Sequence, residues 1–87
     1  MATIIVNHKV KDYATWKPHF DKGEHMRREA TISLLAVGQK AGEPGNVYIV
    51  FKVDNMEKAN QLMSGDELKQ DMQEAGVISA PEILVIE

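Results

Sequence analysis

Four side chains near the N-terminus combine residue types that can bind a small organic molecule and do chemistry on it. His8 comes first, and a second histidine, His19, lies between the aromatic residues Trp16 and Phe20. A neutral imidazole can accept a proton near neutral pH, because histidine has a pKa of about 6.5. Flat aromatic rings can form the walls of a pocket for an apolar ligand. We therefore take His8 as a candidate general base and Trp16, His19 and Phe20 as candidate ligand-binding residues.

Each of these residues also has a purely structural interpretation. His8 can be a hydrogen-bonded histidine at the end of a strand, and Trp16 and Phe20 can simply pack the core. His19 lies at the edge of the same helical stripe, so it can reach the same cavity as His8 or be half exposed. Tyr13 can place its hydroxyl at the mouth of a pocket or lie in a surface turn.

The composition limits the class of protein and its partners. A net charge of −3 gives no general affinity for nucleic acid or anionic membranes, and the absence of cysteine excludes disulfides and thiolate sites. The apolar run at residues 4–6 is too short for a signal peptide or a membrane span. His8, His19 and Glu24 lack the compact spacing of metal ligands. We expect one complete cytoplasmic domain over residues 1–87, with no metal and no cofactor.

These candidate residues must be positioned by strands and helices that the hydrophobic pattern predicts. Alternating apolar runs predict four strands, at residues 3–10, 31–39, 47–53 and 82–87. The third strand is wholly apolar on one side and mostly apolar on the other, which is typical of a central strand covered on both faces. The Gly-, Pro- and Asn-containing segment before it predicts a hairpin loop.

The segment after the first strand predicts one amphipathic helix from Tyr13 to about Ala30, with Asp12 as its N-cap. Pro18 leaves two possibilities: the helix starts at Trp16 after a short turn, or it is kinked at the proline. Arg27 lies on the apolar stripe of this helix. We expect its stem to be buried and its head to reach solvent at the edge of the sheet.

The segment after the third strand predicts two short helices. Asp54 is followed three residues later by Glu57, and Ser64 is followed in the same way by Glu67. This spacing is that of a capping box, so we take Asp54 and Ser64 as N-caps. Gly76 fits the end of the second of these helices. The residues expected to face inward are Met56, Ala59, Leu62 and Met63, followed by Leu68, Met72 and Ala75.

This order of elements predicts an α+β, ferredoxin-like β-α-β-β-α-β fold with a four-stranded antiparallel sheet. Right-handed crossovers place the helices on one face and the first and third strands in the centre. The other face then carries Ile5, Leu35, Val37, Val50, Leu84 and Ile86. An apolar patch of this size is unusual on a monomer, so we predict a homodimer in which two sheets pack face to face, with Tyr48 in the interface.

Three segments of the chain resemble the dimeric α+β barrel superfamily, which includes antibiotic-biosynthesis monooxygenase-like domains and stress-responsive barrel proteins. They are residues 8–21, 75–77 and 81–83, and the resemblance extends over essentially the whole chain. It implies a homodimer with a ligand pocket between the helices and the sheet of each protomer. Members include cofactor-free oxygenases acting on polycyclic phenols, muconolactone-type isomerases and haem-degrading enzymes.

The haem-degrading members have an Asn on the first strand, a Trp ending the third and a His on the last helix. The nearest positions here are Val6 and Val53, and residues 66–75 contain no histidine. The resemblance therefore does not imply haem degradation.

Two functions fit these observations. The first is a small-molecule-binding domain, a cofactor-free monooxygenase or isomerase acting on an aromatic or enolisable substrate, with His8 as base. The second is a non-catalytic dimeric module of regulatory or structural role, in which the same residues fill the core. A cavity beside His8 distinguishes them. A sheet that binds RNA would need exposed aromatic residues and basic surroundings, and this face is aliphatic on an acidic chain.

Overall fold

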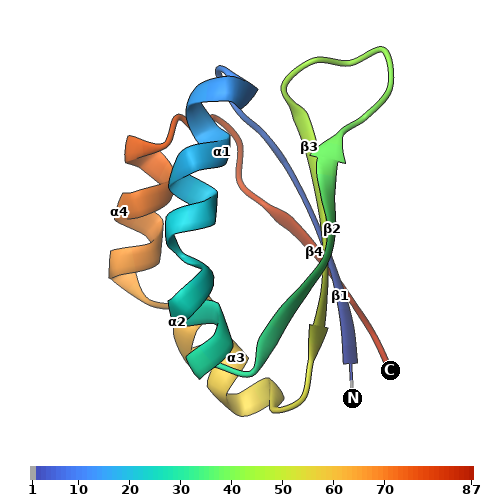
Figure 1. Ribbon diagram of the computed structural model, residues 1–87, viewed down its shortest axis with the longest axis vertical. Helices are drawn as coiled ribbons and strands as arrows, with labels where there is room; N and C mark the ends of the chain where they lie inside the picture. The colour runs from blue at the N-terminus through green and yellow to red at the C-terminus, as the bar shows by residue number, and fades with distance from the viewer. Residues whose placement is uncertain (1) are drawn as a thin grey trace.

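The chain has the ferredoxin-like α+β fold predicted from its sequence. A computed structural model describes residues 2–87, with strands β1 (Ala2–Lys9), β2 (Ile32–Gln39), β3 (Asn46–Val53) and β4 (Glu82–Ile86). The helices are α1 (Tyr13–Lys22), α2 (Glu24–Glu29), α3 (Met56–Met63) and α4 (Asp66–Glu74). The strands form one antiparallel sheet in the order β2-β3-β1-β4, so the first and third strands are central as predicted. All four helices lie on the same side of the sheet (Figure 1).

The core lies between this sheet and the helices, and the central strand β3 contributes alternate residues to it along its length. Every second residue of β3 points to the helices and is buried, from Val47 to Val53, whereas Tyr48 and Lys52 are exposed on the other side. Burying branched side chains of this kind contributes about 1.5–3 kcal/mol each. No helix among the described residues is long and apolar enough to cross a membrane.

The first helical segment begins at Tyr13, one of the two starts that the sequence left open, and it breaks at a residue that the sequence did not single out. Asp12 is the N-cap, and its Oδ2 accepts a hydrogen bond of 3.1 Å from the Thr15 N–H. The helix therefore starts at Tyr13 and includes Pro18. The prediction of one helix to Ala30 is wrong, because α1 ends at Lys22 and α2 starts at Glu24. Gly23, a weak helix former, separates them.

The two predicted N-caps of the second helical segment are each wrong by one residue. Asn55, not Asp54, caps α3, and its side chain accepts a hydrogen bond from the Lys58 N–H at 3.1 Å. Asparagine caps as well as aspartate does, so the sequence alone could not separate these neighbours. Ser64 ends α3 instead of starting α4, and its hydroxyl donates to the Asn60 carbonyl at 2.7 Å.

Other features of this segment follow the prediction. Ala59 is buried, and Met56, Leu62 and Met63 pack against the core. Gly76 follows α4 with φ +89°, a conformation that favours glycine at a helix end.

A β-bulge in β2 changes the predicted faces of its second half. Leu34 is opposite Phe51 and Ala36 is opposite Val50, so Leu35 is an extra residue in β2. Beyond the bulge, Val37 is opposite the buried Ile49 and packs against the core. The prediction that Val37 lies on the uncovered face is therefore wrong, because alternation cannot reveal an inserted residue.

The face of the sheet opposite the helices is uncovered, and its centre is apolar. The pairing places one row of residues across all four strands, namely Ala36, Val50, Ile5 and Leu84. Leu84 is 62% exposed, Leu35 57% and Ile86 53%. Nothing else in residues 2–87 lies on this side of the sheet (Figure 1). We refer to this surface as the open face.

We predict that the loop between β2 and β3 is sensitive to substitution at Gly45. Gly45 has φ +86°, and a Cβ there would lie 2.8 Å from the Val10 carbonyl oxygen. Gly42 also has a positive φ, +79°, but a Cβ there would meet nothing within 4 Å. Gly42→Ala should lower the free energy of unfolding by about 1–2 kcal/mol, and Gly45→Ala by clearly more. Urea denaturation measures both, and equal losses would contradict the close contact.

Candidate functional site

His8 lies on the helix-facing side of β1, the same side as the buried residues Ile4 and Val6. It is 4% exposed and packs edge-on against Trp16 of α1, with ring centroids 5.4 Å apart and an interplanar angle of 75°. Trp16 is 3% exposed. The imidazole is thus the one buried polar side chain among the described residues, and its nearest aromatic neighbour is a predicted ligand-binding residue.

A connected row of aromatic rings extends from His8 along α1. Trp16 contacts Tyr13 at 5.6 Å between centroids and Phe20 at 4.9 Å, and Phe20 stacks on Phe51 of β3 at 6.1 Å. The spacing of Tyr13, Trp16 and Phe20 places them on one face of the helix. We call His8, Tyr13, Trp16, Phe20 and Phe51 the aromatic row. The structure therefore brings together three of the four predicted site residues.

The His8 ring is held neutral and has unused hydrogen-bonding capacity. Burial lowers its pKa from the ordinary value of 6.5, and a smaller contact with its own backbone acts in the opposite direction. Its Nδ1 is buried and has no hydrogen-bond partner within residues 2–87. An unsatisfied buried group costs about 1–3 kcal/mol. A ligand that hydrogen-bonds to this atom would remove that cost, and a neutral imidazole can act as a base.

Access to His8 is closed in this conformation. One surface hollow of about 310 Å³ lies between the start of α1 and the loop before β3, and Tyr13 forms part of its wall. A second hollow of about 360 Å³ lies on the other side of Gly45 and Asn46. Neither is lined by His8, Trp16 or Phe20. Tyr13 belongs to the aromatic row and also lines the first hollow, so it lies between that hollow and Trp16.

The structure does not bring His19 to this site. His19 is exposed on α1, and the aromatic contacts of Trp16 do not include it. His25 is also exposed, and its Nδ1 lies 3.1 Å from the Lys22 carbonyl oxygen. Across residues 2–87 there is no group of three histidine or acidic side chains that could hold a metal ion.

Arg27 of α2 contacts the aromatic row in a way that the sequence did not predict. Its guanidinium carbon lies 4.0 Å from the centroid of the Phe20 ring, and its Nη1 donates to the Phe20 carbonyl at 2.9 Å. We expected this head to extend to solvent at the sheet edge, and the structure shows that it folds back over Phe20 while the residue stays partly exposed. A Cβ at Gly23 would lie 3.0 Å from Nη1, so the glycine gives the guanidinium room. Phe20, Gly23 and Arg27 lie on one stripe of the helical pattern. This spacing was the sequence signal from which the contact between Arg27 and Phe20 could have been predicted.

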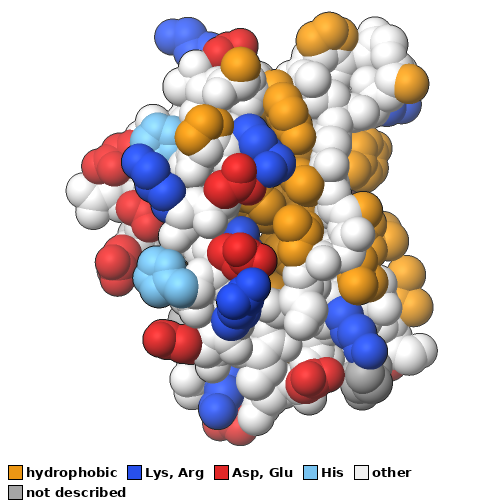
Figure 2. All heavy atoms as spheres, viewed as in Figure 1, with side chains coloured by type: hydrophobic (Ala, Val, Ile, Leu, Met, Phe, Trp, Pro, Cys, Tyr) orange, Lys and Arg blue, Asp and Glu red, His pale blue; other side chains and the backbone are white. Residues whose placement is uncertain are grey.

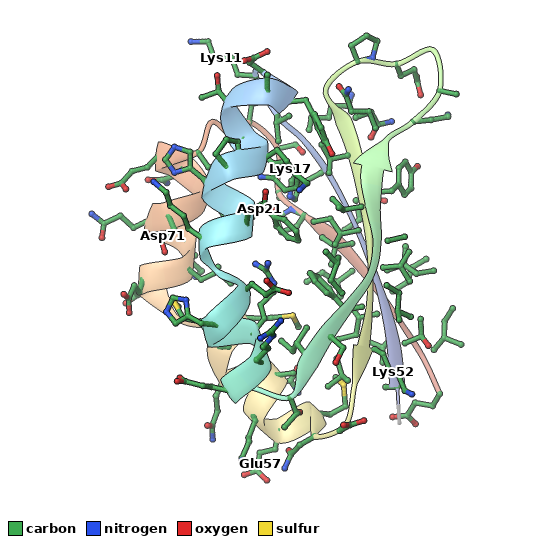
Figure 3. All side chains as sticks on the ribbon, in the orientation of Figure 1. Lys11, Lys17, Asp21, Lys52, Glu57 and Asp71 are labelled. Carbon is green, nitrogen blue, oxygen red and sulfur yellow. The ribbon has the colours of Figure 1, made fainter. Side chains whose placement is uncertain are left out.

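An apolar strip is exposed between the helices and the edge of the sheet. Figure 2 shows it as hydrophobic side chains bordered by charged ones. Leu34 of the edge strand is 37% exposed on this side, and Phe20 and Val37 are partly buried against the core. Lys17 and Asp21 project from α1 toward the sheet (Figure 3) and form an ion pair of 2.6 Å.

Solved structures with the same fold support the resemblance seen in the sequence. A protein from Bordetella bronchiseptica, described as a "putative antibiotic biosynthesis monooxygenase", has a TM-score of 0.77 at 9% identity over 99% of this chain and 94% of its own. A protein from Caulobacter crescentus with the same description has a TM-score of 0.75 at 14% identity over 98% and 86%. The amino-acid sequence matches no protein-family model and no curated protein.

The fold is also found under another description. An uncharacterized NIPSNAP domain protein from Burkholderia xenovorans has a TM-score of 0.68 at 7% identity, over 100% of this chain and 93% of its own. At these identities the likeness shows the fold and not the activity. The chain therefore shares its fold with these proteins.

The buried imidazole predicts a pH dependence of stability. The unfolded chain protonates His8 as the pH falls through about 6.5, whereas the folded chain resists protonation. The free energy of unfolding should therefore stay constant above this pH and decrease as the pH is lowered further. For this one group the decrease is at most about 1.4 kcal/mol per pH unit. His8→Gln should reduce the fall in melting temperature between pH 7.5 and pH 5.5. The exposed His25→Gln is the control, and equal falls in both variants would contradict the assignment.

Proposed function

We propose that the chain binds a small aromatic or enolisable molecule between its helices and its sheet, and acts on it as a cofactor-free monooxygenase or isomerase. The observation that carries this proposal is the buried Nδ1 of His8, which has no partner in residues 2–87 and lies beside Trp16. Trp16 and Phe20 would contact the ligand ring, with Tyr13 at the entrance. We leave His19 out of this site because it is exposed.

The chemistry available to such a site begins with proton abstraction. The neutral imidazole of His8 would take a proton from a phenolic hydroxyl or from a carbon next to a carbonyl group. In an isomerisation the imidazolium returns the proton to a different atom of the substrate, and no oxidant is consumed. In an oxygenation the electron-rich anion of a phenol reacts with dioxygen, which is the oxidant. A C–O bond forms at a ring carbon that carried hydrogen, its C–H bond breaks, and the second oxygen atom leaves as water, so that the phenol becomes a quinone. Burial among apolar side chains strengthens these electrostatic effects because water is excluded.

The proposal includes a homodimer formed through the open face. The central row of that face consists of Ala36, Val50, Ile5 and Leu84, and a second sheet is the surface whose shape and apolar character match it. The edge strand β4 supports the same conclusion, because Leu84 and Ile86 lie on its open-face side and are 62% and 53% exposed. We further propose that the protein acts in the cytoplasm, where its cysteine-free sequence needs no disulfides.

A second candidate function is favoured by a different observation. The packing beside His8 is closed, and both surface hollows lie elsewhere. This is the arrangement expected of a non-catalytic dimeric module, in which Trp16 and His8 only fill the core. A ligand can reach His8 only if side chains packed around it move, because the imidazole is buried. The two candidates therefore differ in whether any small molecule makes contact with His8.

A ligand screen separates the two candidates. Phenolic and β-dicarbonyl compounds are tested by thermal shift, because a compound that binds only the folded state raises the melting temperature by mass action. A compound that binds is then incubated with the protein under air and under nitrogen, and its conversion is followed by absorbance. We expect His8→Gln to abolish conversion, with folding checked by circular dichroism.

Two controls make the screen decisive. His25→Gln changes an exposed histidine and should leave both binding and conversion unchanged. Conversion only under air indicates oxygenation, and conversion under both gases indicates isomerisation. If no compound stabilises the protein, or if His8→Gln converts as fast as the unchanged chain, the enzyme proposal fails and the non-catalytic module is favoured.

A further inference from the structure

We infer that Arg27 binds a negatively charged group of the ligand, so that the molecule this domain accepts is an aromatic anion, such as an aryl carboxylate or a phenolate. The inference rests on the proposed function in one respect, namely that the ligand occupies the apolar strip between the helices and the sheet. It adds the chemical class of the ligand and the residue that selects it.

Arg27 ends the stack of rings that begins at His8. Trp16 and Phe20 stack at 4.9 Å, and the guanidinium covers Phe20 at 4.0 Å and lies 5.9 Å from the Phe51 ring. The site thus has an imidazole at one end, a guanidinium at the other and apolar rings between them. A flat ligand with one acidic group matches this order of side chains.

The carboxylates closest to Arg27 already have other partners. Asp21 pairs with Lys17 at 2.6 Å, and Glu24 pairs with Arg28 at 3.4 Å. Both raise the pKa of Arg27 through space, but burial lowers it by more. None of the ion pairs formed by residues 2–87 includes Arg27.

Most of the hydrogen-bonding capacity of this guanidinium is unused. Arginine has five N–H donors, and the only hydrogen bond that Arg27 makes among the described residues is the one from Nη1 to the Phe20 carbonyl. That bond fixes the guanidinium at the end of α1, which is a structural role, and leaves its other donors free. A partly buried cation without a counter-ion is unfavourable, and a bound carboxylate would offset that cost through paired, charge-assisted hydrogen bonds.

Two fluorescent dyes of nearly the same shape test the inference. The anionic 1-anilinonaphthalene-8-sulfonate and the neutral N-phenyl-1-naphthylamine share one aromatic skeleton and differ in the sulfonate. Both can also bind other apolar surfaces of the protein, so charge recognition is measured by the ratio of the two dissociation constants within each variant. The full chain is titrated with each dye, unchanged and as Arg27→Met, which keeps an apolar side chain over Phe20.

Arg28→Met is the matched control. It removes the same charge from the same short helix, but Arg28 is exposed and makes no contact with the aromatic row. We expect Arg27→Met to weaken the anionic dye by roughly tenfold relative to the neutral dye, and Arg28→Met to change this ratio by less than about twofold. Arg27→Lys keeps the charge without the planar fork, so its ratio should lie between those of the other two variants.

The possible outcomes separate this inference from the proposed function. If both dyes bind and Arg27→Met weakens them equally, Arg27 does not select an anion and the inference is overturned, while a ligand site remains. If neither dye binds the unchanged chain, the inference is overturned, and the screen of phenolic and β-dicarbonyl compounds still decides the small-molecule function. If Arg27→Met does not fold, Arg27→Lys decides, because a ratio identical to that of the unchanged chain contradicts recognition by the guanidinium fork.

Discussion

The fold depends on one constraint, which is that a sheet with apolar side chains on both faces needs two covers. The chain supplies one cover, the helices that bury alternate residues of β3 from Val47 to Val53. Val50 and Ile5 lie on the opposite face, in a row that continues onto both edge strands. Because apolar surface in contact with water is unfavourable in proportion to its area, this row favours association with a second apolar surface. The proposed site lies on the covered side of the same strands.

Two polar groups stand out in that covered layer, and neither is fully satisfied by the protein. His8 carries a buried Nδ1 without a partner among residues 2–87, and Arg27 makes a single hydrogen bond there. They lie at opposite ends of a stack in which Trp16 and Phe20 are the middle members. Unsatisfied groups of this kind reduce stability, so their presence in one stack points to a ligand more strongly than either group does alone.

Alternation and helical periodicity were sufficient to predict the sheet order, the buried face of β3 and the position of His8. These patterns failed at the bulge, where β2 has one residue more than its partner strand, and at the start of α3, where two neighbouring residues could each act as the N-cap. The bulge at Leu35 reversed the face of Val37, and Asn55 took the capping position expected for Asp54. The orientation of Arg27 depends on the gap that Gly23 leaves, a contact in space that helical spacing only suggested. The closed packing at His8 is likewise a matter of how side chains fill a volume, which no sequence pattern encodes.

The most direct test of this account is the mass of the protein in solution. We propose that two copies bury the open face against each other, so sedimentation equilibrium at micromolar concentration should give twice the mass of the chain. Leu84→Lys places a charge in the central row of that face, on the edge strand β4, without changing the helix-facing core. This variant should give the mass of one folded chain. A monomeric mass for the unchanged protein, with its sheet and helices intact by circular dichroism, would contradict the account.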